Sequence, residues 1–353
     1  MIKSKYLGPS PDKGHLQELR ILNRVISWTG SGVTYEADPR HAELLIQELQ
    51  LDGAKGVTTP GSRDDVTKAM AENEETNNEP LPAAQATQYR GFAARLNFLA
   101  QDRPDLLYAS KEASRRMSGP CAGDWGLLKR IGRYLVRVPR MQQLFEWQEM
   151  PDMLRTYVDS DWAGCKTSAK STSGGVVCLG AHTIKAWSST QNVIALSSGE
   201  AELYALVKGS SQTLGLIAMA DDFGVSLGGR VHTDSSAAIG ITTRQGLGKV
   251  RHIRVQYLWV QETIKEKRLS LEKVPGADNP SDIFTKHLDA ATMSRHMTTL
   301  GFSDTRGRAH SAPTLSLFAQ GILTGFAVSV SRSDFGGRGS GGSPPLMKTA
   351  VTS

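Results

Sequence analysis

Four acidic residues stand where short β-prone runs end or where helices are predicted to begin, and carboxylates at such places can bind metal ions. The four are Asp159, Glu202, Asp234 and Asp282. Carboxylate oxygens are the ligands that hard cations such as Mg²⁺ prefer. Four carboxylates that converged without a cation would repel one another and raise their pKa values. The pattern therefore indicates a metal site, provided that the fold brings these side chains together.

The strands that precede two of the acids are predicted to be neighbours in one sheet. Asp159 and Asp234 each end a short β-prone run, and the Gly-bounded runs 174–180 and 183–188 follow the first as an antiparallel meander. The strand before Asp234 is reached through a helix and should lie parallel to its neighbour. Both acids would then lie at the carboxyl ends of adjacent strands, where α/β sheets bind ligands.

The helix that carries Glu202 is predicted from its first turn. Ser197 and Glu200 have the Ser-x-x-Glu spacing of a capping box, and apolar residues recur at helical spacing over 203–218. Glu200 is then a capping residue, whereas Glu202 is not needed for the cap. A solvated helix acid is the alternative interpretation of Glu202.

Two further alternatives stay open at this point. Asp282 begins the last predicted helix, with Pro280 at its first position, and a carboxylate there also stabilises the helix dipole. Asp161 is the alternative to Asp159, because every second side chain of a strand shares a face. The predicted turn at Gly164 favours Asp159.

The chain divides into three zones. Residues 1–150 predict a mainly helical zone, with a polar linker at 61–82 and helices near 39–51, 86–100, 104–117 and 123–135. Residues 154–288 predict an α/β domain with a five-stranded mixed sheet flanked by helices, its fifth strand at 269–275 and a late helix at 253–264. Residues 301–353, rich in Gly, Ser and Arg, predict a disordered low-complexity tail.

The composition is that of a globular chain with a basic balance. The 353 residues are 39% hydrophobic and 22% charged, with a formal net charge of +6 and a pI near 9.2. A positive balance suits a polyanionic partner, although ordinary solvated surfaces carry similar excesses. The three cysteines lack zinc or disulfide spacing and are expected to be reduced thiols. The N-terminal residues lack the apolar core of a signal peptide, and the apolar run 315–330 is too short to span a bilayer. We expect a cytoplasmic or nuclear protein that does not bind membranes.

Several motifs occur in an order that resembles the ribonuclease H (RNase H) domain of copia-type LTR retrotransposon polyproteins. They are YVDSDWAG at 157–164, KSTSGG at 170–175, ALSSGEAEL at 195–203 and the segment 278–288. The resemblance covers about 130 residues. It implies an RNase H-like fold, and it implies that Asp159, Glu202, Asp234 and Asp282 are both the catalytic residues and the metal ligands.

The resemblance also implies a reaction, which is endonucleolytic hydrolysis of RNA in RNA–DNA hybrids. Two Mg²⁺ ions about 3.5–4 Å apart, with Mn²⁺ as an alternative, would activate water and stabilise the leaving 3′-oxygen. RNA would be told from DNA through its 2′-hydroxyls. The candidate nucleic-acid-binding residues are Lys185, Lys249, Arg251, His252, Lys129, Arg130, Arg133 and Arg137. For each lysine and arginine the alternative is an ordinary surface charge, and for His252 it is a helix-capping or core role.

The first zone resembles the thumb and connection that follow the polymerase palm in the same polyproteins. The matching stretches are ELRILNR at 18–24, YEADPRHAE at 35–43, RLNFLAQDRPD at 95–105 and KRIGRYL at 129–135. The Tyr-x-Asp-Asp palm motif is absent, and MADDFG at 219–224 ends a predicted helix rather than a hairpin. We therefore expect RNase H activity without polymerase activity, as part of a retrotransposon reverse transcriptase that associates with other polyprotein products. A catalytically silent nucleic-acid-binding remnant is the alternative.

Overall fold

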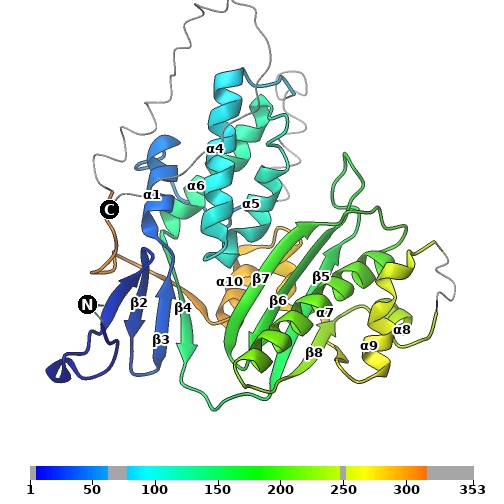
Figure 1. Cartoon of the computed structure of the whole chain (residues 1–353). Helices are drawn as coiled ribbons and strands as arrows, with labels where there is room; N and C mark the ends of the chain where they lie inside the picture. The colour runs from blue at the N-terminus through cyan, green and yellow to red at the C-terminus, as the bar shows by residue number, and fades with distance from the viewer. Residues whose placement is uncertain (1–4, 63–77, 247–251, 316–353) are drawn as a thin grey trace, which may run out of the picture. The chain divides into compact units, whose positions relative to one another are not determined.

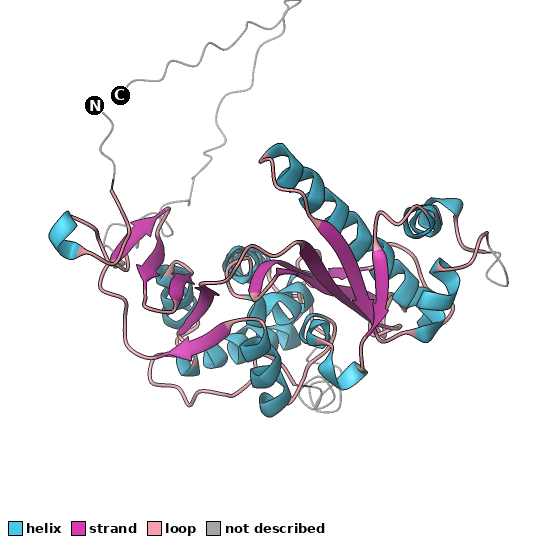
Figure 2. Ribbon diagram, turned by 90° about the horizontal axis from the view of Figure 1, so that it is seen from below, coloured by secondary structure: helices cyan, strands magenta, loops and turns pink. Residues whose placement is uncertain are grey.

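Two five-stranded sheets, with helices packed against them, make up the part of the chain that the computed structural model describes: residues 5–62, 78–246 and 252–315 (Figure 1). The strand order is β1-β2-β3-β4-β10 in one sheet and β7-β6-β5-β8-β9 in the other. Figure 2 shows the strands of the two sheets as separate groups.

The second sheet is mixed and carries the predicted acids. Its strands are β5 (Met153–Asp161), β6 (Thr172–Leu179), β7 (His182–Thr190), β8 (Gly228–Thr233) and β9 (Ser270–Lys273). β5, β6 and β7 form an antiparallel meander, whereas β8 pairs parallel to β5 and β9 parallel to β8. The predicted α/β class and five-stranded mixed sheet of the RNase H type are confirmed by this order.

The helix α7 (Ser198–Asp222) lies across one face of this sheet (Figure 1). It begins where expected, because Ser197 Oγ accepts a hydrogen bond from the Glu200 backbone N–H at 3.2 Å. Its apolar side chains, among them Leu203 and Leu206, share a core with Val158 and Val231 of the sheet. The short helices α8 (Ser236–Thr242) and α9 (Trp259–Lys265) add to that core.

The first sheet and its helices come mostly from the first zone. The strands are β1 (Glu18–Ile21), β2 (Arg24–Trp28), β3 (Gly32–Glu36), β4 (Arg140–Glu146) and β10 (Phe302–Thr305). The helices are α1 (Pro39–Glu48), α4 (Ala83–Ala100), α5 (Leu107–Ser114), α6 (Trp125–Arg137) and α10 (Ala290–Thr299). Six single 3₁₀ turns within the described residues are η1 (Pro11–Lys13), η2 (Pro104–Leu106), η3 (Ala122–Asp124), η4 (Val255–Tyr257), η5 (Gly276–Asp278) and η6 (Pro280–Phe284).

The helices predicted for the first zone are confirmed, but its sheet was not predicted. The strands β1 to β3 have only four or five residues with mixed polar and apolar side chains, too short to show a clear alternation. β1 and β2 are joined by Leu22 and Asn23, both with positive φ, as tight hairpin turns require.

The tail predicted over 301–353 needs a correction at its start. Residues 302–305 form β10, which pairs antiparallel with β4. A four-residue strand whose partner lies far away in the sequence leaves no local signal. The Gly-rich run 336–342 and most of the predicted linker, residues 63–77, lie outside the described residues.

The helix predicted to begin at Asn279 is also corrected. Residues 280–284 form only the turn η6, with Pro280 at its first position as predicted, and the next helix begins at Ala290. The Asn279 side chain explains the tight turn. Its amide nitrogen donates to the Val158 carbonyl at 2.9 Å, and its Oδ1 accepts from the Ser281 backbone N–H at 3.2 Å. The segment is therefore tied to β5 rather than free to continue as a helix.

The late helix predicted over 253–264 is shorter than expected. Residues 255–257 form the turn η4, and α9 begins at Trp259. Ile253 and Val260 are buried in the core beneath α7, as the apolar spacing indicated.

The second sheet has a core on each face. Val177 of β6 packs toward α7, whereas its neighbours Val176 and Cys178 belong to the core formed by α1, α4, α5, α6 and α10. Phe284 of η6 is fully buried in the same core. The first zone and the second sheet thus share apolar side chains, and the predicted domain boundary near residue 150 stays a prediction.

Within the described residues, no helix has the length and apolar character needed to cross a membrane, and residues 316–330 of the apolar run lie outside them. The three cysteines are free thiols.

A buried ion pair beside η2 predicts a large loss of stability when it is broken. Arg103 and Asp105 have side chains 2% and 0% exposed and are joined by hydrogen bonds of 2.7 and 2.9 Å. Asp105→Asn leaves a buried guanidinium without its counter-charge. We expect the free energy of unfolding to fall by about 3–5 kcal/mol, measured by urea denaturation.

The exposed pair Arg230–Glu272 supplies the control, with side chains 40% and 50% exposed. Glu272→Gln is expected to cost less than about 1 kcal/mol. Equal losses for the two variants would contradict the role assigned to burial.

Candidate metal centre

Three of the four predicted acids converge at one edge of the second sheet. Each of Asp159, Glu202 and Asp234 offers a carboxylate oxygen, and the three oxygens lie within 4.8 Å of one another. Asp159 lies near the carboxyl end of β5, and Asp234 directly follows the parallel neighbour β8. The first turns of α7 bring Glu202 to the same edge. The predicted placement of Asp159 and Asp234 is confirmed.

Glu202 is held by one oxygen and leaves the other unpaired. Its Oε1 accepts from the backbone N–H of Ser160 at 3.2 Å and from Ser160 Oγ at 3.0 Å. Its Oε2 is buried and has no hydrogen-bond partner among the described residues. A buried oxygen without a partner costs free energy. A hard cation bound between the three acids would satisfy this oxygen, so the residues present fit a divalent metal ion.

The acids raise one another's pKa values in the absence of such an ion. Burial raises the pKa of Glu202 to about 8, and repulsion from Asp159 and Asp234 adds to this effect. Burial likewise raises the pKa of Asp159 to about 7, although attraction to Lys286 opposes the rise. The pKa of Asp234 is raised by burial and by Asp282. A bound cation would lower these pKa values and keep the three carboxylates ionised.

Asp282 lies at the same edge but outside the group of three, and a lysine is its ion-pair partner. Lys286 Nζ is 2.9 Å from Asp282 Oδ1 and 3.9 Å from Asp159 Oδ2. Thr285 Oγ1 donates a hydrogen bond to Asp159 Oδ2. Thr285 and Lys286 were not singled out from the sequence, although both lie in the segment 278–288 that carried the resemblance.

Asp161, the alternative to Asp159, takes another place. Asp159 is 4% exposed and pairs with Gly174 of β6, whereas Asp161 lies at the end of β5 opposite Thr172. The Asp161 carboxylate lies against Gly164, where a Cβ atom would leave it no room. Both acids lie within β5, before the turn at Gly164, and of the two it is Asp159 that offers an oxygen to the group of three.

Glu200 and His252 form a second polar cluster near the start of α7. Glu200 is 2% exposed and accepts from the Leu196 backbone N–H at 2.9 Å and from the Tyr204 hydroxyl. His252 Nε2 lies 2.7 Å from its Oε2. The Glu200 carboxylate therefore bonds Leu196 rather than closing the predicted box on Ser197, and His252 is a partner of that carboxylate.

The predicted nucleic-acid-binding residues are spread over several elements. Lys185 is exposed on β7, and Lys249 and Arg251 lie outside the described residues. On α6, Arg130 donates to Thr59 Oγ1 at 3.0 Å and Arg133 to the Lys55 carbonyl at 2.8 Å. Lys129 and Arg137 of the same helix are exposed. Each of these residues stays a candidate.

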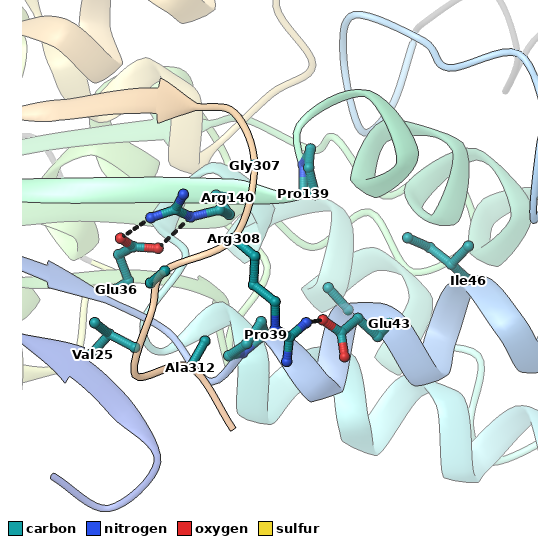
Figure 3. A pocket seen from close by; sticks show the side chains of 12 residues that line it. Val25, Glu36, Pro39, Glu43, Ile46, Pro139, Arg140, Gly307, Arg308 and Ala312 are labelled. Carbon is teal, nitrogen blue, oxygen red and sulfur yellow. Dashed lines mark hydrogen bonds and ion pairs between the residues drawn. The ribbon is translucent and has the colours of Figure 1, made fainter. Parts of the chain in front are cut away.

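Two pockets lie away from the carboxylates of Asp159, Glu202 and Asp234. A cavity of about 70 Å³ beside α1 contains the Glu36–Arg140 pair and the Arg308–Glu43 pair (Figure 3). A larger open cleft of about 610 Å³ lies between α7 and the end of β7, lined by Tyr204, Lys208 and Trp259 among others. It adjoins the helix that carries Glu202.

The strand order and the three acids at the sheet edge define an RNase H-like α/β domain. No family model matches the chain. The Pol polyprotein of transposon RE2 from Arabidopsis thaliana is 29% identical over 218 residues, or 61% of this chain and 15% of the relative. The Pol polyprotein of transposon TNT 1-94 from Nicotiana tabacum is 26% identical over 253 residues, which are 70% of this chain and 18% of the relative. Both relatives are retrovirus-related Pol polyproteins of Ty1/copia-type plant transposons, and the chain spans less than a fifth of their length.

Two solved structures are similar over part of the chain. LC11-RNase H1 in complex with an RNA/DNA hybrid is 17% identical and covers 37% of this chain and 93% of its own, with a TM-score of 0.28. The foamy viral protease–reverse transcriptase in complex with double-stranded DNA is 12% identical over 74% of this chain and 46% of its own, with a TM-score of 0.41. The fold assignment rests on the strand order itself.

Close packing between β6 and η6 predicts that a methyl group at Gly174 would disturb the centre. A Cβ atom there would lie 2.6 Å from Thr285 Cγ2 and 2.7 Å from Phe284 Cβ. Because Phe284 is fully buried, Gly174→Ala must shift the segment that carries Thr285. We expect a loss of about 1–3 kcal/mol in unfolding free energy and weaker Mn²⁺ binding, measured by calorimetry.

The control is Gly240→Ala in α8, where an added Cβ meets no atom within 4 Å. Alanine favours a helix interior by about 1 kcal/mol over glycine, so this variant should be as stable as the parent or more stable. Unchanged Mn²⁺ binding in the Gly174 variant would show that the contact does not position the carboxylates.

The raised pKa values predict that the metal-free protein loses stability as the pH rises. Unfolded carboxyls titrate near pH 4, whereas Asp159 and Glu202 titrate near 7 and 8 in the folded chain. Their contribution is fully present at low pH and is lost as the pH rises through the folded values. Between pH 7 and 8.5, with a chelator present, unfolding free energy should fall on the order of 1 kcal/mol.

The variant Glu202→Gln removes the group with the larger shift in this window and should flatten the decline, as measured by urea denaturation at each pH. Asp221→Asn, at the far end of α7, should keep it. A parent protein whose stability is constant over this window would contradict the electrostatic picture of the centre.

Proposed function

We propose that this chain hydrolyses the RNA strand of RNA–DNA hybrids, using divalent metal ions held by Asp159, Glu202, Asp234 and Asp282, as the nuclease part of a retrotransposon reverse transcriptase. The observation that carries the proposal is the convergence of three carboxylate oxygens within 4.8 Å, with Glu202 Oε2 buried and unpaired among the described residues. In a structural ion-pair network, the buried Glu202 Oε2 would face a basic group instead. Magnesium is the proposed ion, because the donor set is oxygen only.

The residues of the chain have distinct parts in this proposal. Bound metal ions would activate a water and stabilise the leaving oxygen. Asp159, Glu202, Asp234 and Asp282 would hold the ions. Ser160 orients Glu202 through two hydrogen bonds, and Thr285 orients Asp159 through one. These bonds reduce the freedom of the carboxylates before an ion arrives, as hydrogen bonds to the ligands do in metal sites.

The surface supports a nucleic-acid substrate. The chain has a net charge of +6, and the cleft along α7 includes Lys208, whose ammonium group donates to Ser189 Oγ at 2.5 Å. Lys185 lies on β7 beside it and lowers the pKa of Lys208, together with burial. Basic side chains of this kind hold phosphates without reading sequence. The homologous Pol polyproteins make an RNA–DNA hybrid the proposed partner and association with other polyprotein products a further one.

We expect this chain to have no polymerase activity. Asp221 and Asp222, which imitate a polymerase motif in the sequence, end the helix α7. A polymerase centre needs such acids on a hairpin between strands.

The proposal predicts that Asp234→Asn abolishes cleavage of a labelled RNA–DNA hybrid in Mg²⁺. Loss of a metal ligand should cost more than the roughly 10–100-fold that changes around such ligands cost. The rate of hybrid cleavage is the measurement, with double-stranded DNA as the substrate that should stay intact.

Asp221→Asn is the matched control, since it makes the same chemical change at the other end of α7. It should cleave as the parent does. Equal cleavage by the Asp234 variant would overturn the catalytic assignment. Hybrid binding without cleavage by the parent would favour the silent nucleic-acid-binding remnant.

A further inference from the structure

A lysine ammonium stands among the acids where a second cation would bind. Lys286 Nζ lies 2.9 Å from Asp282 Oδ1 and 3.9 Å from Asp159 Oδ2. These two acids lie on different elements, one on η6 and one on β5. The ammonium therefore bridges the group of three carboxylates and the fourth acid that the group does not include.

The charges at this edge of the sheet explain why a cation belongs there. Four ionised carboxylates carry four negative charges, and one divalent ion at the group of three neutralises two of them. The lysine supplies a third positive charge without any second ion. Two divalent ions and the lysine together would exceed the charge of the four acids. Lys286 already lies against oxygens of Asp159 and Asp282, which a second ion held by these two acids would also need.

We infer that Lys286 is a positioning residue that occupies the second cation place between Asp282 and Asp159, so that a second divalent ion binds only after this side chain swings out. This inference rests on the proposed function, because it assumes a first ion at Asp159, Glu202 and Asp234. It assigns the centre two states, with one divalent ion and the lysine inward, or with two ions and the lysine outward.

The structure provides the means for this exchange. The Lys286 side chain is 31% exposed, whereas Asp159 and Asp282 are 5% and 15% exposed. The acids are thus held in place while the lysine has solvent on one side. Its long aliphatic stem lets the charged end move to water without moving the backbone. Its neighbour Thr285 donates its own hydrogen bond to Asp159, and a movement of the Lys286 side chain does not require that bond to break.

The test is metal binding by the full chain without nucleic acid, using Mn²⁺ as the probe and calorimetry with electron paramagnetic resonance as the readout. The parent should bind one ion well and a second weakly. Lys286→Met keeps the length of the side chain and removes its charge. It should tighten the second ion by about tenfold or more, because a positive charge a few ångströms from a divalent ion is removed. Asp282→Asn should lose the second ion and keep the first.

Lys273→Met is the matched control. Lys273 ends β9 at the same side of the sheet and donates to Ser236 Oγ at 2.6 Å rather than to the acids. Its removal should change the second affinity by less than about threefold, as expected for an exposed and screened charge. Identical ion counts and affinities in the parent and the Lys286 variant would overturn the inference and leave the proposed function standing. Absence of ion binding in all variants would overturn both.

A second measurement needs no variant of Lys286 and covers the case in which Lys286→Met does not fold. The parent is treated with an amine-acetylating reagent at rising Mg²⁺, and labelling of each lysine is read by mass spectrometry. Labelling of Lys286 should rise at the Mg²⁺ concentration that fills the second place, while labelling of Lys273 stays constant. Labelling of Lys286 that is constant or falls would overturn the inference.

Discussion

Mutual repulsion among carboxylates at one edge of the second sheet is the constraint on which the arrangement of that sheet and its helices depends. The parallel pairing of β5 with β8 brings Asp159 and Asp234 to the same edge, and α7 adds a third acid from above it. Such a group is stable only if protons or cations neutralise it. The contacts around the carboxylates offset part of this repulsion. Ser160 and Thr285 donate hydrogen bonds to the acids, and Lys286 supplies a positive charge.

The apolar core that the first zone shares with the second sheet explains how the short turn η6 can hold Asp282 and Thr285 in place. η6 has five residues and no helix to stiffen it. It is held from both sides, by the Asn279 bond to the Val158 carbonyl and by Phe284, which is fully buried among side chains of the first zone. The position of Asp282 and Thr285 therefore depends on apolar packing with residues more than a hundred positions earlier. The first zone contributes to the metal centre without offering a ligand.

The sequence predicted those parts of the fold that have a strong local pattern. The start of α7 followed from the cap at Ser197 and the apolar face of the helix, and the placement of Asp159 and Asp234 followed from short strands with a helical crossover. The assignment of Glu202 came from the resemblance, because a solvated helix acid fits the same position. The first sheet was missed because its strands are short and its edge strand β10 comes from residues that looked like a tail. The contact of Lys286 with Asp159 was missed for a related reason. A lysine four residues after an acid is ordinary in a helix, and only the turn η6 directs it to Asp159 on another strand.

Glycines at the sheet show how tightly the centre is coupled to its scaffold. Gly174 stands opposite Asp159 on β6 and leaves the space that Thr285 and Phe284 fill. On the other face, Gly209 of α7 lets the helix approach Val158 so closely that a Cβ atom would lie 2.4 Å from it. Side chains at these two places would push η6 and α7 away from β5, and those two elements carry Asp282 and Glu202. The distances among the acids therefore depend on close packing at glycines on both faces of the second sheet. A change in either core would alter the affinity for metal even where no ligand is replaced.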